Sequence, residues 1–223
     1  MNREGWMDME HYKLRLLPEE LRLYAVTDRR WLNGRSLYDA VREAIDGGAT
    51  LIQIREKDLE PGQFKAEASE IRELCASRGI HLLINDNVAL AKEISADGVH
   101  IGQDDMGAEE ARKILGPDKI IGVTAKTIEQ ARLAEEAGAD YLGVGAVFPT
   151  ESKMDAKRIT IEQLRAITQA VSIPAVAIGG ITEQNAEQLK GSGVAGIAVV
   201  SALFAQSNIR TAAKKLRRIA DGI

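Results

Sequence analysis

Three polar side chains stand at alternate positions where a short apolar segment near residue 50 ends. Gln53, Arg55 and Lys57 occur at intervals of two residues at the end of the segment 50–54. Because side chains along a strand alternate between its faces, Gln53 and Arg55 share one face with Leu51, Ile52 and Ile54 occupy the other, and Lys57 lies just beyond the strand. An amide and two cations that converge suit a ligand with several negative charges, since arginine grips phosphate oxygens in pairs. The alternative is a surface pair between Arg55 and Glu56.

Carboxylates follow two further apolar segments. Asp86 comes after the segment 81–84, and Asp105 follows the segment 98–101. Mg²⁺ in proteins takes one or two carboxylates, with phosphate oxygens and water completing its shell. Beside a polyanion site we therefore expect these two aspartates to hold Mg²⁺, although spacing alone does not favour Asp105 over its neighbour Asp104. Taken alone, Asp86 and the asparagine before it would be an ordinary N-cap for a helix that begins near residue 88.

Small residues end the last two apolar segments. Gly179 and Gly180 follow the segment 174–178, and Ser201 follows Val200 at the end of another. In an eight-fold β/α barrel the loops after strands seven and eight form a recurrent phosphate site from backbone N–H groups. Glycine there lets a phosphate approach the backbone closely. The alternative is a tight turn that needs glycine for its dihedral angles alone.

The segment 148–159 is long for a connection between a strand and a helix, and such loops are often functional lids. It offers hydroxyls at Thr150 and Ser152 and a cation at Lys153. The alternative is a solvated loop with no role. A lone histidine, His100, points inward from the segment 98–101, where a hydrogen-bonded core residue is commoner than a catalyst.

Turns of one kind must position these residues. Four times a helix ends in a small-residue turn that contains glycine and leads into an apolar segment, as at Gly48 and Gly138. Eight such segments alternate with helical patterns, which predicts an α/β fold, a single (β/α)8 TIM barrel over 21–223 with an N-terminal extension over 1–20. An open flavodoxin-like sheet is the rival, but it needs fewer strands and one switch point. The segments lie at 21–26, 50–54, 81–84, 98–101, 120–123, 140–144, 174–178 and 196–200.

Bulk properties exclude several function classes. The 223 residues carry a net charge of −4, which argues against a nucleic-acid or anionic-membrane partner. Cys75 is the only cysteine, as expected of a protein in a reducing cytosol. The first 20 residues lack the apolar core of a signal peptide. We therefore expect a soluble, cytoplasmic protein that binds small molecules; the sequence does not fix its oligomeric state.

Together these segments carry a family resemblance. They are 53–57, 85–86, 98–103, 122–124, 145–153, 178–181 and 200–201. From residue 23 to about 205 the chain resembles the thiamine-phosphate synthases. That family is a β/α barrel that joins a hydroxymethylpyrimidine diphosphate to a thiazole phosphate and releases pyrophosphate. The resemblance therefore implies a transferase of thiamine biosynthesis that uses Mg²⁺.

The resemblance also implies a role for each matching residue. The pyrimidine diphosphate would be bound by Gln53, Ile54, Arg55, Glu56, Lys57, Asn85, Thr124 and Lys153. The thiazole phosphate would be bound by Thr150, Glu151, Ser152, Gly180, Val200 and Ser201. Mg²⁺ would be held by Asp86 and Asp105, and Arg55, Lys57 and Lys153 would neutralise the leaving group. Thr124 stands where serine is usual and Ser152 where threonine is usual, and both keep a hydroxyl.

Two other functions compete with the synthase. A sister thiazole tautomerase uses a similar barrel but should need neither a diphosphate grip nor paired metal carboxylates. Lys126 also stands where the catalytic histidine of that relative is expected. A non-catalytic phosphate-binding barrel predicts loss of the metal and leaving-group residues, which are all present. An assay of pyrophosphate release with both substrates and Mg²⁺ separates the three.

Overall fold

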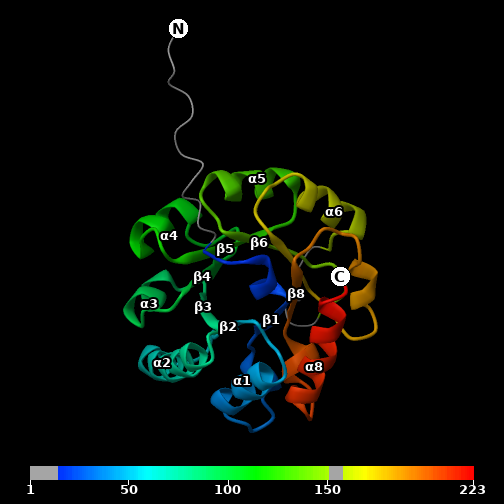
Figure 1. The fold of residues 1–223 in the computed structure, drawn as a ribbon. Helices are drawn as coiled ribbons and strands as arrows, with labels where there is room; N and C mark the ends of the chain where they lie inside the picture. Colours follow the sequence, from blue (N-terminus) through cyan, green and yellow to red (C-terminus); the bar gives the residue numbers. More distant parts are fainter. Residues whose placement is uncertain (1–14, 151–157) are drawn as a thin grey trace.

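The computed structural model describes residues 15–150 and 158–223. Eight parallel strands close into a barrel in chain order, with each strand paired to the next and β8 paired to β1. Figure 1 shows the strands at the centre and the helices in a ring around them. The strands are β1 (Leu23–Val26), β2 (Leu51–Ile54), β3 (His81–Asn85), β4 (Gly98–Ile101), β5 (Ile120–Ala125), β6 (Tyr141–Gly145), β7 (Ala175–Ile178) and β8 (Gly196–Val199). The predicted barrel is confirmed, and the open sheet is excluded.

Helices separate most of the strands. The α-helices are α1 (Leu37–Asp46), α2 (Pro61–Ser77), α3 (Val88–Glu93), α4 (Ala108–Leu115), α5 (Ile128–Glu136), α6 (Ile161–Gln169), α7 (Ser201–Phe204) and α8 (Ile209–Ala220). Three 3₁₀ turns accompany them: η1 (Pro18–Leu21), η2 (Arg29–Trp31) and η3 (Ala186–Leu189). Glycine at the turns after α1 and α5 has a positive φ, 107° at Gly48 and 85° at Gly138, as the turn pattern predicts.

Alternation along each strand produces two cores. Side chains such as Ile52 and Ile54 pack between the strands and the outer helices. Their neighbours on β2, beginning with Leu51, point into the barrel, where they meet Tyr24 and Tyr141. The predicted faces of β2 are therefore confirmed. Gln53 lies one step above Leu51 on the inner face, which places its amide below the carboxyl end of the barrel.

The segment before β1 covers the amino end of the barrel. Leu16 and Leu21 are buried and belong to the interior cluster. Arg15 pairs with Asp140 at 2.6 Å. The part of the extension that the structure describes is thus packed against the barrel, while residues 1–14 lie outside the described residues. The division of the chain at residue 20 stays a prediction.

Candidate active site

A cavity of about 390 Å³ opens at the carboxyl ends of the strands, and we call it the mouth cavity. Barrel enzymes build their active sites at this end. Residues from seven of the segments singled out by the sequence line it. The predicted site residues that line it are Gln53, Arg55, Lys57, Asn85, Asp86, Asp105, Thr124, Thr150, Gly180, Val200 and Ser201. Glu151, Ser152 and Lys153 lie outside the described residues.

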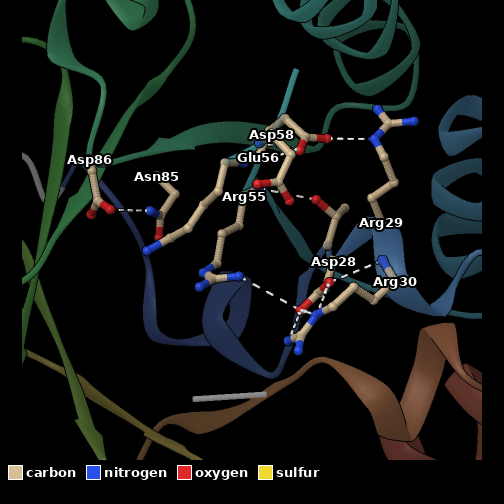
Figure 2. A network of polar contacts seen from close by, with 10 residues as sticks. Asp28, Arg29, Arg30, Arg55, Glu56, Asp58, Asn85 and Asp86 are labelled. Carbon is tan, nitrogen blue, oxygen red and sulfur yellow. Dashed lines mark hydrogen bonds and ion pairs between the residues drawn. The ribbon is translucent and has the colours of Figure 1, made fainter. Parts of the chain in front are cut away.

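The guanidinium of Arg55 is held beside a buried carboxylate. Arg55 Nη1 lies 3.6 Å from Asp28 Oδ2, and the Asp28 side chain is only 5% exposed. Figure 2 shows Asp28 between Arg55 and Arg30, which donates to the same carboxylate from Nη2 at 2.6 Å. Burial by itself raises the pKa of Asp28, but the hydrogen bonds and charge of Arg30, with the charge of Arg55, hold it below its usual value. Asp28 therefore stays ionised and keeps Arg55 at the rim of the cavity.

Two predicted site residues on either side of Arg55 face away from the mouth cavity. Ile54 packs in the outer core. The Glu56 carboxylate accepts from Arg29 Nε at 2.7 Å and from the backbone N–H of Lys57 at 2.9 Å (Figure 2). Glu56 thus pairs with Arg29 and not with Arg55, so the alternative of an Arg55–Glu56 surface pair is wrong. Any ligand contact of Ile54 and Glu56 would have to use the backbone, and it stays a prediction.

The two predicted metal carboxylates approach each other across β3 and β4. Burial, and then the adjoining Asp105 carboxyl, raise the pKa of Asp86 to about 6. Asp86 also has a positive φ of 59°, a backbone conformation that is uncommon for residues with a side chain and that aspartate tolerates better than most. Asp105 Oδ2 accepts from the Gly102 N–H at 2.8 Å, whereas Asp104 does not line the cavity. Geometry thus favours Asp105 over Asp104, which spacing alone did not.

The interpretation of Asp86 as a helix cap is wrong. The N-cap of α3 is Asn87, whose Oδ1 accepts from the Leu90 N–H at 2.9 Å. Asp86 instead accepts from the side-chain amide of Asn85, the contact drawn in Figure 2. The asparagine after Asp86 takes over the capping role, so the Asp86 carboxylate is left at the mouth cavity.

Two carboxylates and an amide fit what Mg²⁺ takes from a protein when phosphate oxygens complete its shell. Among the described residues no group of three or more histidine, cysteine or acidic side chains could hold a metal by itself. The donor set therefore suits an ion that arrives with a phosphorylated ligand. It does not suit a closed structural metal site.

The opposite wall of the mouth cavity contains two consecutive glycines after β7. Gly179 and Gly180 have φ values of 98° and 66°, so both conformations favour glycine. A Cβ at Gly180 would lie 2.1 Å from the carbonyl oxygen of Pro149. Glycine at position 180 is therefore required both by the dihedral angles of its turn and by the nearby Pro149 carbonyl. This supports the alternative that the turn needs glycine for conformational reasons. The same turn leaves the wall open to a ligand beside Val200 and Ser201.

A chain of hydrogen bonds crosses the floor of the cavity. Gln53 Nε2 donates to the Tyr24 hydroxyl, which is 2.8 Å from the Tyr141 hydroxyl. Tyr141 lies 2.8 Å from His100 Nδ1, and His100 Nε2 lies 3.0 Å from Thr124 Oγ1. The expectation that His100 is a hydrogen-bonded core residue is confirmed, and His100 also lines the cavity.

Comparison with known proteins decides the family. The family described as thiamine monophosphate synthase matches residues 23–203. The chain belongs to the thiamine-phosphate synthase family. Its relatives include thiamine-phosphate synthases of Clostridium novyi (strain NT), 48% identical over 89% of this chain and 98% of the relative, and of Clostridium tetani (strain Massachusetts / E88), 49% identical over 87% and 93%.

A solved structure agrees with this assignment. The thiamine phosphate pyrophosphorylase from Pyrococcus furiosus is 41% identical and superposes with a TM-score of 0.86, covering 92% of this chain and 98% of that one. The chain is thus a transferase of thiamine biosynthesis, as its sequence indicates. In the parts of the chain that the structure describes, no helix is both long enough and apolar enough to span a bilayer.

Sequence reasoning assigned no place in the site to three polar side chains of this synthase that line the mouth cavity: Tyr24, Asp28 and Thr182. Lys126, which the sequence placed where the catalytic histidine of the tautomerase is expected, lines the cavity as well. Asp28 lies two residues beyond β1, and the rule that polar residues after a strand face the mouth could have found it. Tyr24 carried no such signal, because an inward tyrosine within a strand is typical of a core. Lys126 directly follows β5 and adds a further cation to the lining of the cavity.

Proposed function

We propose that this synthase joins 4-amino-2-methyl-5-(diphosphooxymethyl)pyrimidine to a thiazole ethyl phosphate, giving thiamine phosphate and pyrophosphate. The observation that carries the proposal is the division of the mouth cavity into two walls. Arg55, Lys57 and the Asp86–Asp105 pair make one wall, and glycine backbone near Gly180 makes the other. A diphosphate suits the charged wall, and a single phosphate suits the backbone wall.

The reaction needs a stabilised leaving group more than a nucleophilic side chain. The bond between the methylene carbon and the diphosphate oxygen breaks, and the electron pair leaves with pyrophosphate. The amino group of the pyrimidine delocalises the positive charge left at the methylene carbon. The thiazole nitrogen then supplies its electron pair to form the new C–N bond, so the step balances without a protein nucleophile.

The residues act on charge and position. Arg55, Lys57 and Lys153 would neutralise the departing pyrophosphate, and electrostatic stabilisation of this kind often contributes more to catalysis than any other effect. Asp86 and Asp105 would hold Mg²⁺, which when bound supplies further positive charge to the same oxygens. Gln53, Asn85 and Thr124 would orient the pyrimidine. Thr150, Ser152 and Ser201 would bind the thiazole phosphate beside Gly180, and Glu151 and Val200 would contact it through the backbone.

Binding both substrates in one enclosed cavity also protects the intermediate. Holding the two reacting atoms in line removes most of the entropy cost of a bimolecular step. A closed mouth keeps water from adding to the cation. The segment 148–159 would supply this closure once ligands are bound, an expectation that concerns a region mostly outside the described residues.

The test is an assay of the purified chain for pyrophosphate release. We expect release only when both substrates and Mg²⁺ are present, and loss when any one is omitted. Isomerisation of the thiazole phosphate without pyrophosphate release would favour the tautomerase. Binding of both phosphates with no turnover would favour a non-catalytic barrel. Either of these outcomes would overturn the proposal.

A further inference from the structure

The hydrogen-bond chain under the mouth cavity joins two residues that belong to opposite sides of the barrel. Tyr24 on β1 and Tyr141 on β6 are both fully buried, and their hydroxyls meet inside the barrel. This series of hydrogen bonds begins at Gln53 and ends at Thr124, and both of these residues line the cavity. The two end residues therefore do not present their polar atoms independently.

The first contact determines which group donates and which accepts in every later hydrogen bond of the series, and we call this sequence of donors and acceptors the proton order. The amide nitrogen of Gln53 donates to Tyr24, and an amide nitrogen cannot accept a hydrogen bond. The one hydrogen of the Tyr24 hydroxyl must then go to its other partner, Tyr141, because a buried donor is costly to leave unpaired. Tyr141 in turn has its own hydrogen to give, and His100 Nδ1 lies 2.8 Å away.

The same direction of donation continues from Tyr141 through His100 to Thr124 at the surface of the cavity. A neutral imidazole that accepts at Nδ1 carries its hydrogen at Nε2. His100 Nε2 therefore donates to Thr124 Oγ1, 3.0 Å away. The Thr124 hydroxyl, having accepted from below, has its own hydrogen to donate into the cavity. Its backbone is held as well, since Gln103 Nε2 donates to the Thr124 carbonyl at 2.6 Å.

We propose that Tyr141 is a positioning residue that couples Gln53 to Thr124 and thereby fixes what the floor of the cavity offers a ligand. Thr124 is presented as a donor, and the oxygen of the Gln53 amide is presented as an acceptor. This pair matches an amino-substituted nitrogen heterocycle, which carries a donor on its amino group and an acceptor on a ring nitrogen. The inference rests on the proposed function for the identity of that ligand, but the proton order does not.

The proton order can be measured without activity. The chain has three histidines, so ¹⁵N-histidine labelling gives three sets of ring signals, and His100→Gln assigns the one from position 100. We expect the Nε2–H tautomer for His100 at neutral to slightly alkaline pH. The Nδ1–H tautomer, or an imidazolium, would overturn the proposed order even if pyrophosphate release proceeds as expected.

The coupling is tested with Tyr141→Phe. Losing one neutral hydrogen bond should raise KM for the pyrimidine diphosphate about 5- to 10-fold and leave KM for the thiazole phosphate unchanged. It should also change the ¹⁵N signal of His100 Nδ1. The matched control is Tyr38→Phe on α1, a tyrosine that packs against the outer core, which should move neither KM nor the His100 signals.

A second variant keeps the coupling testable if Tyr141→Phe folds poorly. In Tyr24→Phe, Tyr141 can still donate to His100, so the Nε2–H tautomer should persist while Gln53 loses its partner. KM for the pyrimidine diphosphate should then rise by a smaller factor. A variant that lowers the melting temperature but leaves both KM values unchanged would show a purely structural role and refute the proposal.

Discussion

The two ends of the barrel use charge in opposite ways. At the amino end the buried carboxylate of Asp140 meets two cations and a backbone N–H group. Asp140 pairs with Arg15 at 2.6 Å and with Arg112 at 2.7 Å, and accepts from the Ile121 N–H at 2.8 Å. At the carboxyl end Asp86 faces Asp105, and its pKa is raised to about 6. Asp28, also at the carboxyl end, is neutralised by Arg30 and Arg55, so the contrast is between Asp140 and the Asp86–Asp105 pair. Two like charges side by side mark a place where a ligand can neutralise them, which assigns Asp140 to stability and the Asp86–Asp105 pair to function.

Removing the mouth carboxylates should have the largest effect on turnover. Asp86→Ala and Asp105→Ala should each lower kcat by about 10²–10³-fold and weaken its dependence on Mg²⁺, because leaving-group stabilisation is lost. Steady-state assays over a range of Mg²⁺ concentrations measure this. Full activity of both variants at limiting Mg²⁺ would show that the metal assignment is wrong.

Removing Lys153, the cation of the segment 148–159, should have the next largest effect on turnover. Lys153→Ala should lower kcat by about 10²-fold, at the low end of the range for one lost stabilising group, with a melting temperature close to that of the parent. Limited proteolysis should cut the segment 148–159 in the free protein, and pyrophosphate with Mg²⁺ should suppress the cut. Unchanged turnover in Lys153→Ala would leave Arg55 and Lys57 as the cations of the leaving group.

The amino end should respond in stability and not in activity. Asp140→Ala removes one acceptor from each of two arginines and leaves the Ile121 N–H without its side-chain acceptor, so the free energy of unfolding should fall by roughly 1–3 kcal/mol. Denaturant titration measures the loss, and KM for both substrates should stay at the parental values. A selective change in either KM would mean that the two ends are not separate in role.

Asp86→Asn should raise stability at pH 7 while it lowers Mg²⁺-dependent activity, as Asp86→Ala does. A folded-state pKa of about 6, above the ordinary value of 3.8, means that the folded protein binds this proton more tightly than the unfolded chain. The contribution of Asp86 to stability therefore falls as pH rises from about 4 to 6, and at pH 7 its charge opposes folding. Melting temperatures of parent and variant should differ most above about pH 6, in favour of the variant.

The smallest effect should come from His81 at the amino end. The hydrogen bond with Asp97, then the charges of Asp97 and Glu20, raise the pKa of His81 above 6.5. Its stabilising contribution is complete below about pH 6.5 and is lost as pH rises through the folded-state pKa. His81→Gln should therefore cost about 0.5 kcal/mol near pH 6 and less near pH 8, as for other partly exposed ion pairs. If the stability loss in His81→Gln does not change with pH, the charge of His81 does not contribute to stability.

The sequence by itself determined the strands and the polar residues at their ends. Period-two alternation placed Gln53 and Arg55 on the inner face of β2, and turn glycines such as Gly48 marked where helices end. These features depend on a few neighbouring residues, so one sequence is enough to predict them. Closure of the barrel was predictable in the same way, because eight buried strands in succession have few other ways to bury both faces.

Only the tertiary structure decided which side chains meet. Tyr24 and Tyr141 are 117 positions apart, and their contact depends on strands β1 and β6 facing each other across the closed barrel. The choice of Asp105 over Asp104 and the pairing of Glu56 with Arg29 likewise depend on which neighbours the fold brings close. Electrostatic and hydrogen-bond partners are set by distances of a few ångströms between remote segments, and no local pattern in the sequence encodes such a distance.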